Sequence, residues 1–348
     1  MPEFRKDPIS GRWVIISTDR GSRPSEFLTH IQHNPNQDSP FSPGNEAQTP
    51  PEVLAFRLPE TLPDTPGWSL RVVPNKYPAI HTNGDTKTGD MQSDEWFSNI
   101  PASGIHEVII ESTDVKEKFS TMDTGQIFDV LRAYQKRIRS IKQDTRWQYV
   151  QIFKNHGYLA GATLHHPHSQ LMALPFIPQV VQTELDAAET HFRHHNRCIF
   201  CDLHQQELKN KDRVIIEGEL FSVISAYAAR FSYECWILPK AHLAHFELAG
   251  EKKLRELSIV LKDIIQRLDT LLSNPAYNMI LHTAPLQSAD TEHYHWHLEI
   301  LPRLAFVAGF EQSSGVYINS TSPEHAAQQL REIVKESLPL MRNVNEVV

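Results

Sequence analysis

The sequence has 348 residues, of which 40% are apolar and 22% charged, as in an ordinary globular protein with enough apolar side chains for a full core. Its 42 acidic against 34 basic residues give a formal net charge of −8, which argues against nucleic acid or an anionic membrane as a partner. No apolar run is long enough to span a bilayer and no signal peptide is evident, so a cytoplasmic location is expected. Three cysteines are too few for a disulfide framework, whereas the 19 histidines are unusual and clustered.

The first half of the chain is predicted to form a sheet covered by one long helix. Apolar side chains recur every three or four positions after Asp123 and predict an amphipathic helix that ends near Ile141. The residues between 31 and 67 are rich in Pro, Asn, Gln and Ser and predict a covering loop. Short β-branched or alternating apolar runs predict strands at residues 12–17, 70–73, 106–112 and 147–153.

The second half repeats this order of elements. Apolar runs predict strands at 213–216, 221–224 and 235–240, a helix with one apolar stripe from Leu254 to Leu271, and strands at 277–282 and 293–302. Such a duplication predicts an α+β fold of two similar halves, each an antiparallel sheet with a long helix. The predicted halves are residues 1–180 and 190–348, with a boundary in the polar segment 178–197. Ser322, Pro323 and Glu324 predict the start of a final helix over 323–338.

The stretch Gly161–Gln170, GATLHHPHSQ, concentrates side chains that can act on phosphorus. If it forms a strand, alternation places His166, His168 and Gln170 on one face. A neutral imidazole is a competent nucleophile toward phosphorus, and a neighbouring amide can donate a hydrogen bond to the phosphoryl oxygen. The alternative is a group of histidines with satisfied hydrogen bonds and no chemical role. The clustering favours His168 as a nucleophile and leaves His165 without an assigned role.

This stretch, together with RWVI at 12–15, FKN at 153–155 and WILPK at 236–240, resembles the galactose-1-phosphate uridylyltransferase family. That family belongs to the histidine triad superfamily and includes an ADP-glucose phosphorylase branch. The resemblance covers nearly the whole chain and implies a tandem histidine-triad-like fold. It also implies ping-pong transfer of a nucleoside monophosphate between a sugar nucleotide and a hexose 1-phosphate, and a homodimer.

The resemblance also implies roles for particular residues. His168 would form the nucleotidyl-histidine intermediate, and Gln170 would bind the transferred phosphoryl group. Asn155 and Thr163 would lie near phosphate, and Asn75 near the base or ribose. The other substrate-binding residues that the resemblance implies are Arg20, Arg23, Gly309, Phe310 and Glu311.

A metal site is predicted in the second half. Cys198 and Cys201 have the two-residue gap of a zinc knuckle, and two thiolates need two more nitrogen or sulfur ligands for tetrahedral closure. Spacing alone does not choose among the later histidines. The resemblance implies His242 and His295 as the other ligands of a structural zinc. Two buried thiols without metal are one alternative, and the family suggests a second: a metal held by Glu184, His282, His297 and Glu299.

The first half departs from the family pattern. Members with two zinc sites carry a Cys-x-x-Cys pair where this chain has Ser39 and Ser42. Neutral hydroxyls are poor zinc ligands, so His106 and His166 are interpreted as the remaining half of a lost site. No zinc is expected there, and His166 is expected to be hydrogen-bonded and to orient the catalytic strand.

The leading prediction of function is uridylyl transfer from UDP-glucose to galactose 1-phosphate, in galactose metabolism. Ala305 and Phe310 replace a lysine and a tyrosine that bind the hexose phosphate in uridylyltransferases, and residues 305–311 look closer to the ADP-glucose phosphorylase branch. Adenylyl transfer from ADP-glucose to inorganic phosphate is therefore the close alternative. A hypothesis of another class is a nucleotide-binding protein that has lost its chemistry.

Overall fold

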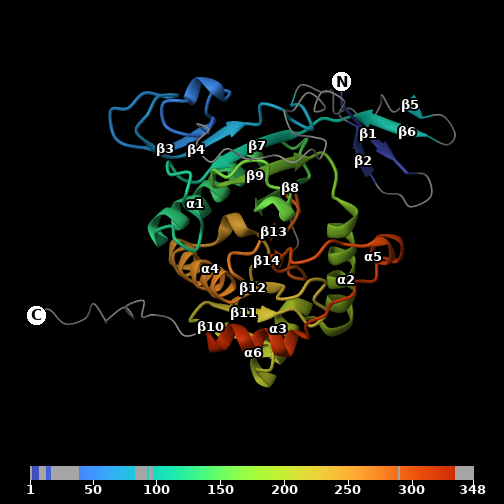
Figure 1. Cartoon of the computed structure of the whole chain (residues 1–348). Coiled ribbons are helices and arrows are strands. Elements are labelled where there is room, and N and C mark those ends of the chain that lie inside the picture. Colours follow the sequence, from blue (N-terminus) through green and yellow to red (C-terminus); the bar gives the residue numbers. More distant parts are fainter. Residues whose placement is uncertain are drawn as a thin grey trace, which may run out of the picture.

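The computed structural model describes residues 2–7, 13–16, 39–82, 92–93, 97–288 and 291–333. Its main feature is one ten-stranded antiparallel sheet to which both halves of the chain contribute (Figure 1). The halves join in the middle, where β13 pairs with β8 from Tyr277 opposite His156 to Leu281 opposite Ile152. In spatial order the strands are β10 (Val214–Glu217), β11 (Phe221–Ser225), β12 (Cys235–Pro239), β14 (His297–Pro302), β13 (Tyr277–His282), β8 (Tyr149–His156), β9 (His168–Leu174), β7 (Ile105–Ile110), β4 (Trp68–Pro74) and β3 (Leu54–Arg57).

The predicted duplication is confirmed. Strands β3, β4 and β7, helix α1 (Thr124–Ile141) and strands β8 and β9 follow one another in the first half. Strands β10, β11 and β12, helix α4 (Glu251–Leu272) and strands β13 and β14 repeat that order in the second half. The predicted α+β fold of two similar halves is therefore correct, and the two sheets are continuous because β8 and β13 hydrogen-bond to each other.

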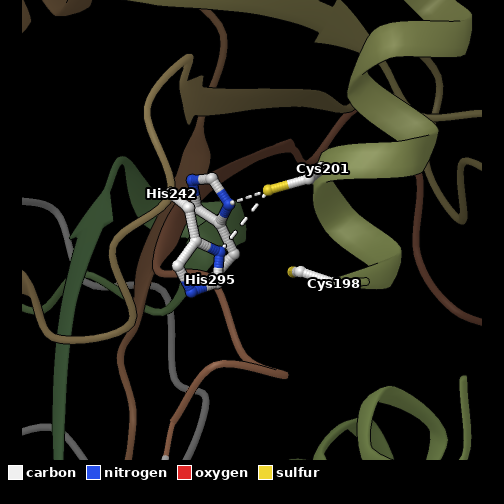
Figure 2. A group of neighbouring side chains, drawn as sticks. All are labelled: Cys198, Cys201, His242 and His295. Atoms are coloured by element: carbon white, nitrogen blue, oxygen red, sulfur yellow. Dashed lines mark hydrogen bonds between the residues drawn. The ribbon is translucent and has the colours of Figure 1, made fainter. Parts of the chain in front are cut away.

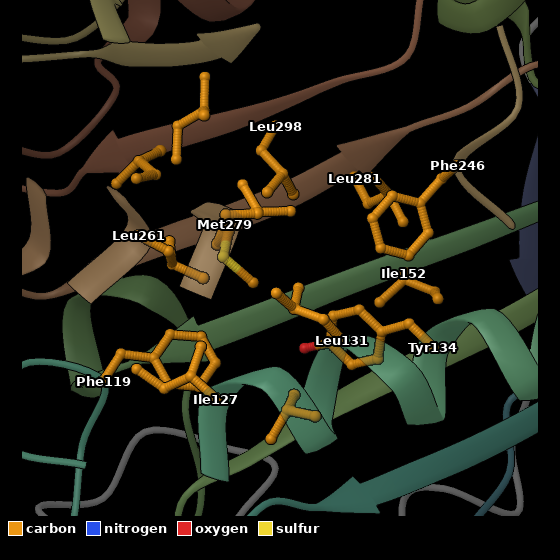
Figure 3. Close-up of a cluster of buried hydrophobic side chains, with 14 of the residues drawn as sticks. Phe119, Ile127, Leu131, Tyr134, Ile152, Phe246, Leu261, Met279, Leu281 and Leu298 are labelled. Carbon is orange, nitrogen blue, oxygen red and sulfur yellow. The ribbon is translucent and has the colours of Figure 1, made fainter. Parts of the chain in front are cut away.

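Helices α1 and α4 pack side by side against one face of the sheet (Figures 1 and 3). The Asp123 carboxylate accepts a hydrogen bond of 2.7 Å from the Gly125 amide at the start of α1, as its position before the apolar stripe predicts. Figure 3 shows Leu131 of α1 and Leu261 of α4 among the strand side chains of this shared core. Burial of one apolar stripe from each helix therefore holds the two halves together.

The opposite face of the second half is covered by α2 (Gln179–His195) and α3 (Ile199–Asn210). The polar segment 178–197 is thus largely a helix, which the sequence did not indicate. Only a narrow stripe of α2, formed by Val181, Leu185 and Ala188, is buried, so the polar residues dominate its composition.

The remaining elements lie around the large sheet. A four-stranded sheet is formed by β1 (Glu3–Lys6), β2 (Trp13–Ile16), β5 (Gln92–Ser93) and β6 (Ser98–Pro101). The short helices are η2 (Glu46–Gln48), η4 (Tyr158–Ala160), η5 (Phe246–Leu248), α5 (Gly309–Ser314) and α6 (Pro323–Glu332). Residues 31–38 of the predicted loop at 31–67 lie outside the described residues, and the rest of it contains β3, a strand that forms by pairing with β4. The predicted C-terminal helix begins at Pro323 and is capped by Ser322. Among the described residues, no helix is both long and apolar enough to cross a membrane.

Candidate active site

His168 is the first residue of β9, between β7 and β8 in the first half of the sheet. Along β9, Leu171 and Ala173 point into the shared core, so His168 and Gln170 lie on the opposite face, as the alternation predicts. The His168 side chain is buried, and the Phe41 ring packs against it at a centroid distance of 5.6 Å. The candidate nucleophile therefore lies at the end of a strand in a partly apolar environment.

A main-chain hydrogen bond selects the tautomer of His168. Its Nδ1 lies 2.8 Å from the carbonyl oxygen of His166. A carbonyl can only accept, so this contact assigns the proton to Nδ1 and leaves the lone pair on Nε2. Neutral imidazole with its lone pair on Nε2 is the form that can attack phosphorus.

Gln170 is oriented by His106, a residue for which the sequence suggested a different role. The Ala79 amide donates a hydrogen bond of 3.1 Å to His106 Nδ1, which assigns the proton of that ring to Nε2. Nε2 therefore donates a hydrogen bond of 2.9 Å to Gln170 Oε1. With its oxygen occupied by His106, the Gln170 side chain can direct its NH₂ group toward a phosphoryl oxygen.

The interpretation of His106 and His166 as two ligands of one former zinc site is wrong. In the antiparallel register of β7 and β9, His106 lies opposite Met172, well along the strand from His166. His166 Nε2 instead lies 2.7 Å from the Ser112 carbonyl oxygen, so the expected hydrogen bond of His166 is confirmed. Burial lowers the pKa of His166, which favours its neutral form.

Other residues implied in substrate binding are distributed unevenly. The Asn75 amide donates a hydrogen bond of 2.8 Å to the carbonyl oxygen of His106 on β7, the strand that pairs with β9. Asn155 lies on β8 and its Oδ1 accepts a hydrogen bond of 2.9 Å from Asn278 of β13, at the junction of the two halves. Thr163 is half-buried in the segment that leads into β9.

Three implied residues lie in another part of the molecule. Gly309, Phe310 and Glu311 begin α5, which is drawn well away from β9 in Figure 1. Phe310 is exposed. Arg20 and Arg23 lie outside the described residues.

The four predicted zinc ligands lie together in the second half (Figure 2). Cys198 and Cys201 stand at the start of α3, facing His242, which follows β12, and His295, which precedes β14. Cys201 Sγ lies 3.4 Å from His242 Nδ1 and 3.3 Å from His295 Nδ1. All four ligand atoms lie within 4.8 Å of one another.

This geometry fits a tetrahedral zinc ion held by two thiolates and two imidazoles. The structure selects His242 and His295 among the nearby histidines, a choice that spacing alone did not allow. The neighbouring Cys201 thiol and the imidazoles of His242 and His295 lower the pKa of Cys198 despite its burial. A thiolate is therefore favoured at Cys198, as a metal ligand requires.

The alternative metal set is also assembled. Ligand atoms of Glu184, His282 and His297 lie within 4.8 Å of one another, and His282 Nε2 lies 3.5 Å from Glu299. Although burial opposes it, hydrogen bonds with Glu184 and Glu299 raise the pKa of His282 to about 10. In this structure the group is thus a largely buried ion-pair cluster in which His282 lies between two carboxylates and Glu299 also pairs with Arg230, whereas the cysteine set offers the thiolates that zinc prefers.

Comparisons with known proteins identify the family of this chain. The family model for the N-terminal domain of galactose-1-phosphate uridyl transferase matches residues 1–178, and the model for its C-terminal domain matches residues 184–337. The chain belongs to the galactose-1-phosphate uridylyltransferase family. It is therefore a member of a nucleotidyltransferase family, as the sequence motifs predicted.

Two curated relatives show the range of this family. ADP-glucose phosphorylase of Arabidopsis thaliana is 39% identical over 337 residues, covering 95% of this chain and 93% of the relative. Galactose-1-phosphate uridylyltransferase of Thermotoga maritima is 27% identical over 340 residues, covering 95% of this chain and 98% of the relative.

Solved structures of both kinds have the same fold. A crystal structure of the Arabidopsis thaliana ADP-glucose phosphorylase with bound ADP-glucose matches with a TM-score of 0.76 and 37% identity, over 96% of this chain and 100% of that chain. A structure of uridylyltransferase matches with a TM-score of 0.78 and 27% identity, over 94% of this chain and 97% of that chain.

Proposed function

We propose that this protein transfers a nucleoside monophosphate from a sugar nucleotide to a phosphate-bearing acceptor through a covalent adduct on Nε2 of His168. The observation that carries this proposal is the 2.8 Å contact between His168 Nδ1 and the His166 carbonyl oxygen. It assigns the lone pair of the neutral ring to Nε2 and gives the Nδ1 proton an acceptor when the ring becomes positively charged.

The transfer takes place in two displacements. Nε2 attacks the α-phosphorus, the bond from that phosphorus to the bridging oxygen breaks, and the sugar 1-phosphate leaves with the electron pair. An oxygen of the acceptor phosphate then attacks the same phosphorus, and the phosphorus–nitrogen bond breaks with its electron pair returning to Nε2. The amide of Gln170, held by His106, donates to the phosphoryl oxygen as negative charge develops on it.

ADP-glucose as donor and inorganic phosphate as acceptor are the favoured substrates. The 39% identity to an ADP-glucose phosphorylase over 95% of the chain supports this choice. Ala305 and Phe310 support it as well, because neither side chain can bind a hexose phosphate as lysine and tyrosine do. The second candidate, uridylyl transfer from UDP-glucose to galactose 1-phosphate, is supported by the family models and by the uridylyltransferase relatives.

The remaining proposals concern the assembly. Cys198, Cys201, His242 and His295 would hold one structural zinc ion that ties the start of α3 to the segments flanking β12 and β14. The family resemblance supports a homodimer, and a cytoplasmic location stays the expectation from the sequence.

Product analysis with two substrate pairs tests the proposed reaction. The purified protein is incubated with ADP-glucose and phosphate, and separately with UDP-glucose and galactose 1-phosphate, and the nucleotides and sugar phosphates are separated by chromatography. The proposal predicts ADP and glucose 1-phosphate from the first pair at a much higher kcat/KM than any product from the second. The reverse preference would establish uridylyl transfer, and binding without product from either pair would contradict enzymatic function.

A further inference from the structure

We propose that Lys154 and Glu111, a buried ion pair beneath β9, are positioning residues that fix the main chain of His168 for its attack on phosphorus. This inference rests on the proposed role of His168 as the nucleophile. Neither residue lies on the face of the sheet that carries the imidazole, so each acts through the backbone.

The ion pair is fully enclosed. The side chains of Lys154 and Glu111 are 2% and 0% exposed, and Lys154 Nζ lies 2.5 Å from Glu111 Oε2. The Phe119 ring lies over the ammonium group at 4.8 Å from its centroid. The same Nζ donates a hydrogen bond of 3.2 Å to the carbonyl oxygen of His168.

The other oxygen of Glu111 is also used. The Ser169 hydroxyl donates to Glu111 Oε1, and the hydroxyl of Tyr134 lies 2.5 Å from Ser169 Oγ. Ser169 directly follows His168, and its side chain points into the core face of β9. The network therefore grips the catalytic strand both at the His168 carbonyl and at the next side chain.

Lys154 supplies a bond near the place where strand pairing stops. The last pair between β8 and β9 in the direction of His168 is Phe153 with Gln170. Beyond this pair, the Glu111 amide donates a hydrogen bond of 3.1 Å to the Pro167 carbonyl oxygen, and the Lys154 ammonium group donates one to the His168 carbonyl oxygen. The carbonyl oxygens of three consecutive residues thus each accept a hydrogen bond. His168 Nδ1 donates to that of His166, the Glu111 amide to that of Pro167, and Lys154 Nζ to that of His168.

A need for stability alone does not explain a charged pair at this position. Replacing a buried ion pair by well-packed apolar residues is often neutral or stabilising, and the surrounding core is apolar. An apolar side chain cannot donate a hydrogen bond to the His168 carbonyl. Nucleophilic attack requires reacting atoms about 3–3.5 Å apart, and a 1 Å misplacement costs about 100-fold in rate.

The test separates positioning from stability with one single and one double variant. Lys154→Met leaves Glu111 charged and buried without its partner, so it should destabilise the fold. Lys154→Met with Glu111→Gln removes both charges and keeps a side chain that can accept from Ser169. The melting temperature of the double variant should recover toward that of the wild type.

Single-turnover formation of the acid-labile adduct is followed over a range of ADP-glucose concentrations, which gives a limiting rate and a half-saturation concentration. The inference predicts that the double variant keeps the half-saturation concentration but loses about 100-fold in limiting rate. Tyr277→Phe, which removes a buried hydroxyl that has no hydrogen-bond partner among the described residues, should stay within a few-fold of the wild type.

A wild-type limiting rate in the stable double variant would overturn the inference and leave the proposed function intact. Absence of the adduct on the wild type would overturn the proposed function, and the inference with it. If the double variant does not fold, Ser169→Ala supplies the same comparison without a change of charge: the inference predicts about a 10-fold lower limiting rate, and an unchanged rate would contradict it.

Discussion

Nε2 of His106 on β7 lies 2.9 Å from Oε1 of Gln170 on β9, so a histidine on one strand sets the direction of an amide on the next. The consequence is chemical because the amide can present its NH₂ group to the phosphate only while its oxygen is held by another donor. The two side chains should therefore act as one unit in catalysis.

Replacing Gln170 by Ala should lower the limiting rate of adduct formation about 100-fold, because a donor to the developing negative charge is lost. His106→Leu should lower it about 10-fold, because the amide remains but is no longer oriented. The double variant should be no slower than Gln170→Ala alone, since coupled residues are not additive. His165→Ala, at an exposed position, is the control and should keep the wild-type rate. Fully additive losses would contradict the coupling.

Metal analysis should find one zinc ion per chain, held by the cysteine set. Cys201→Ser should lose most of this zinc and melt at a lower temperature, because a hydroxyl is a poor zinc ligand. Cys235→Ala is the matched control, since this buried cysteine is not part of the four-residue set. Zinc that persists in Cys201→Ser but disappears in His282→Gln would place the metal at the alternative set instead.

The folded state should lose stability in acid because of Glu247, which links the two halves by an ion pair of 2.9 Å with Lys142, the residue that directly follows α1. Burial disfavours its charge, but the His245 imidazole, 3.4 Å away, and the hydrogen bond from Lys142 outweigh this and lower the pKa of Glu247 to about 2. Because the pKa of Glu247 is lower in the folded than in the unfolded state, its ionised form stabilises the fold. This contribution is fully present above pH 4.5, the ordinary pKa of the carboxyl group, and is lost as the pH falls from 4.5 toward 2. At neutral pH, Glu247 should contribute about 3 kcal/mol to the free energy of unfolding.

Urea unfolding at a series of pH values measures this effect. Glu247→Gln should be less stable than the wild type at pH 7 and should lose less stability between pH 4.5 and 2. Glu219→Gln is the control, because Glu219 pairs with Lys252 on the exposed surface and should contribute little. Equal acid sensitivity of the wild type and Glu247→Gln would show that other groups control the acid transition.

Local patterns predicted much of the fold. The apolar side chains of α1 and α4 recur with the helical period, and the same order of elements on each side of the midpoint indicated the duplication. The face shared by His168 and Gln170 follows from strand alternation, which depends on neighbouring residues only. Cys198 and Cys201 were likewise recognisable because their spacing is local.

The features that the sequence did not reveal depend on contacts between distant segments. The misassigned partner of His166 illustrates this: the register of β7 against β9, which separates His106 from His166, has no signal in either strand alone. The pairing of β8 with β13, and that of β3 with β4, likewise depend on contacts between separate segments and leave no signal within one strand. The division into residues 1–180 and 190–348 stays a prediction, as do the substrate contacts of Arg20 and Arg23.

The most direct test of the account is covalent labelling of His168. The protein is incubated with ADP-glucose, and separately with UDP-glucose, each radiolabelled at the α-phosphate, and the acid-labile label is mapped to a peptide. We expect ADP-glucose to label the peptide that contains His168 in preference to UDP-glucose. The variant His168→Asn should carry no label. Equal labelling of His168→Asn, or turnover of a donor by the wild type without any covalent label, would contradict it.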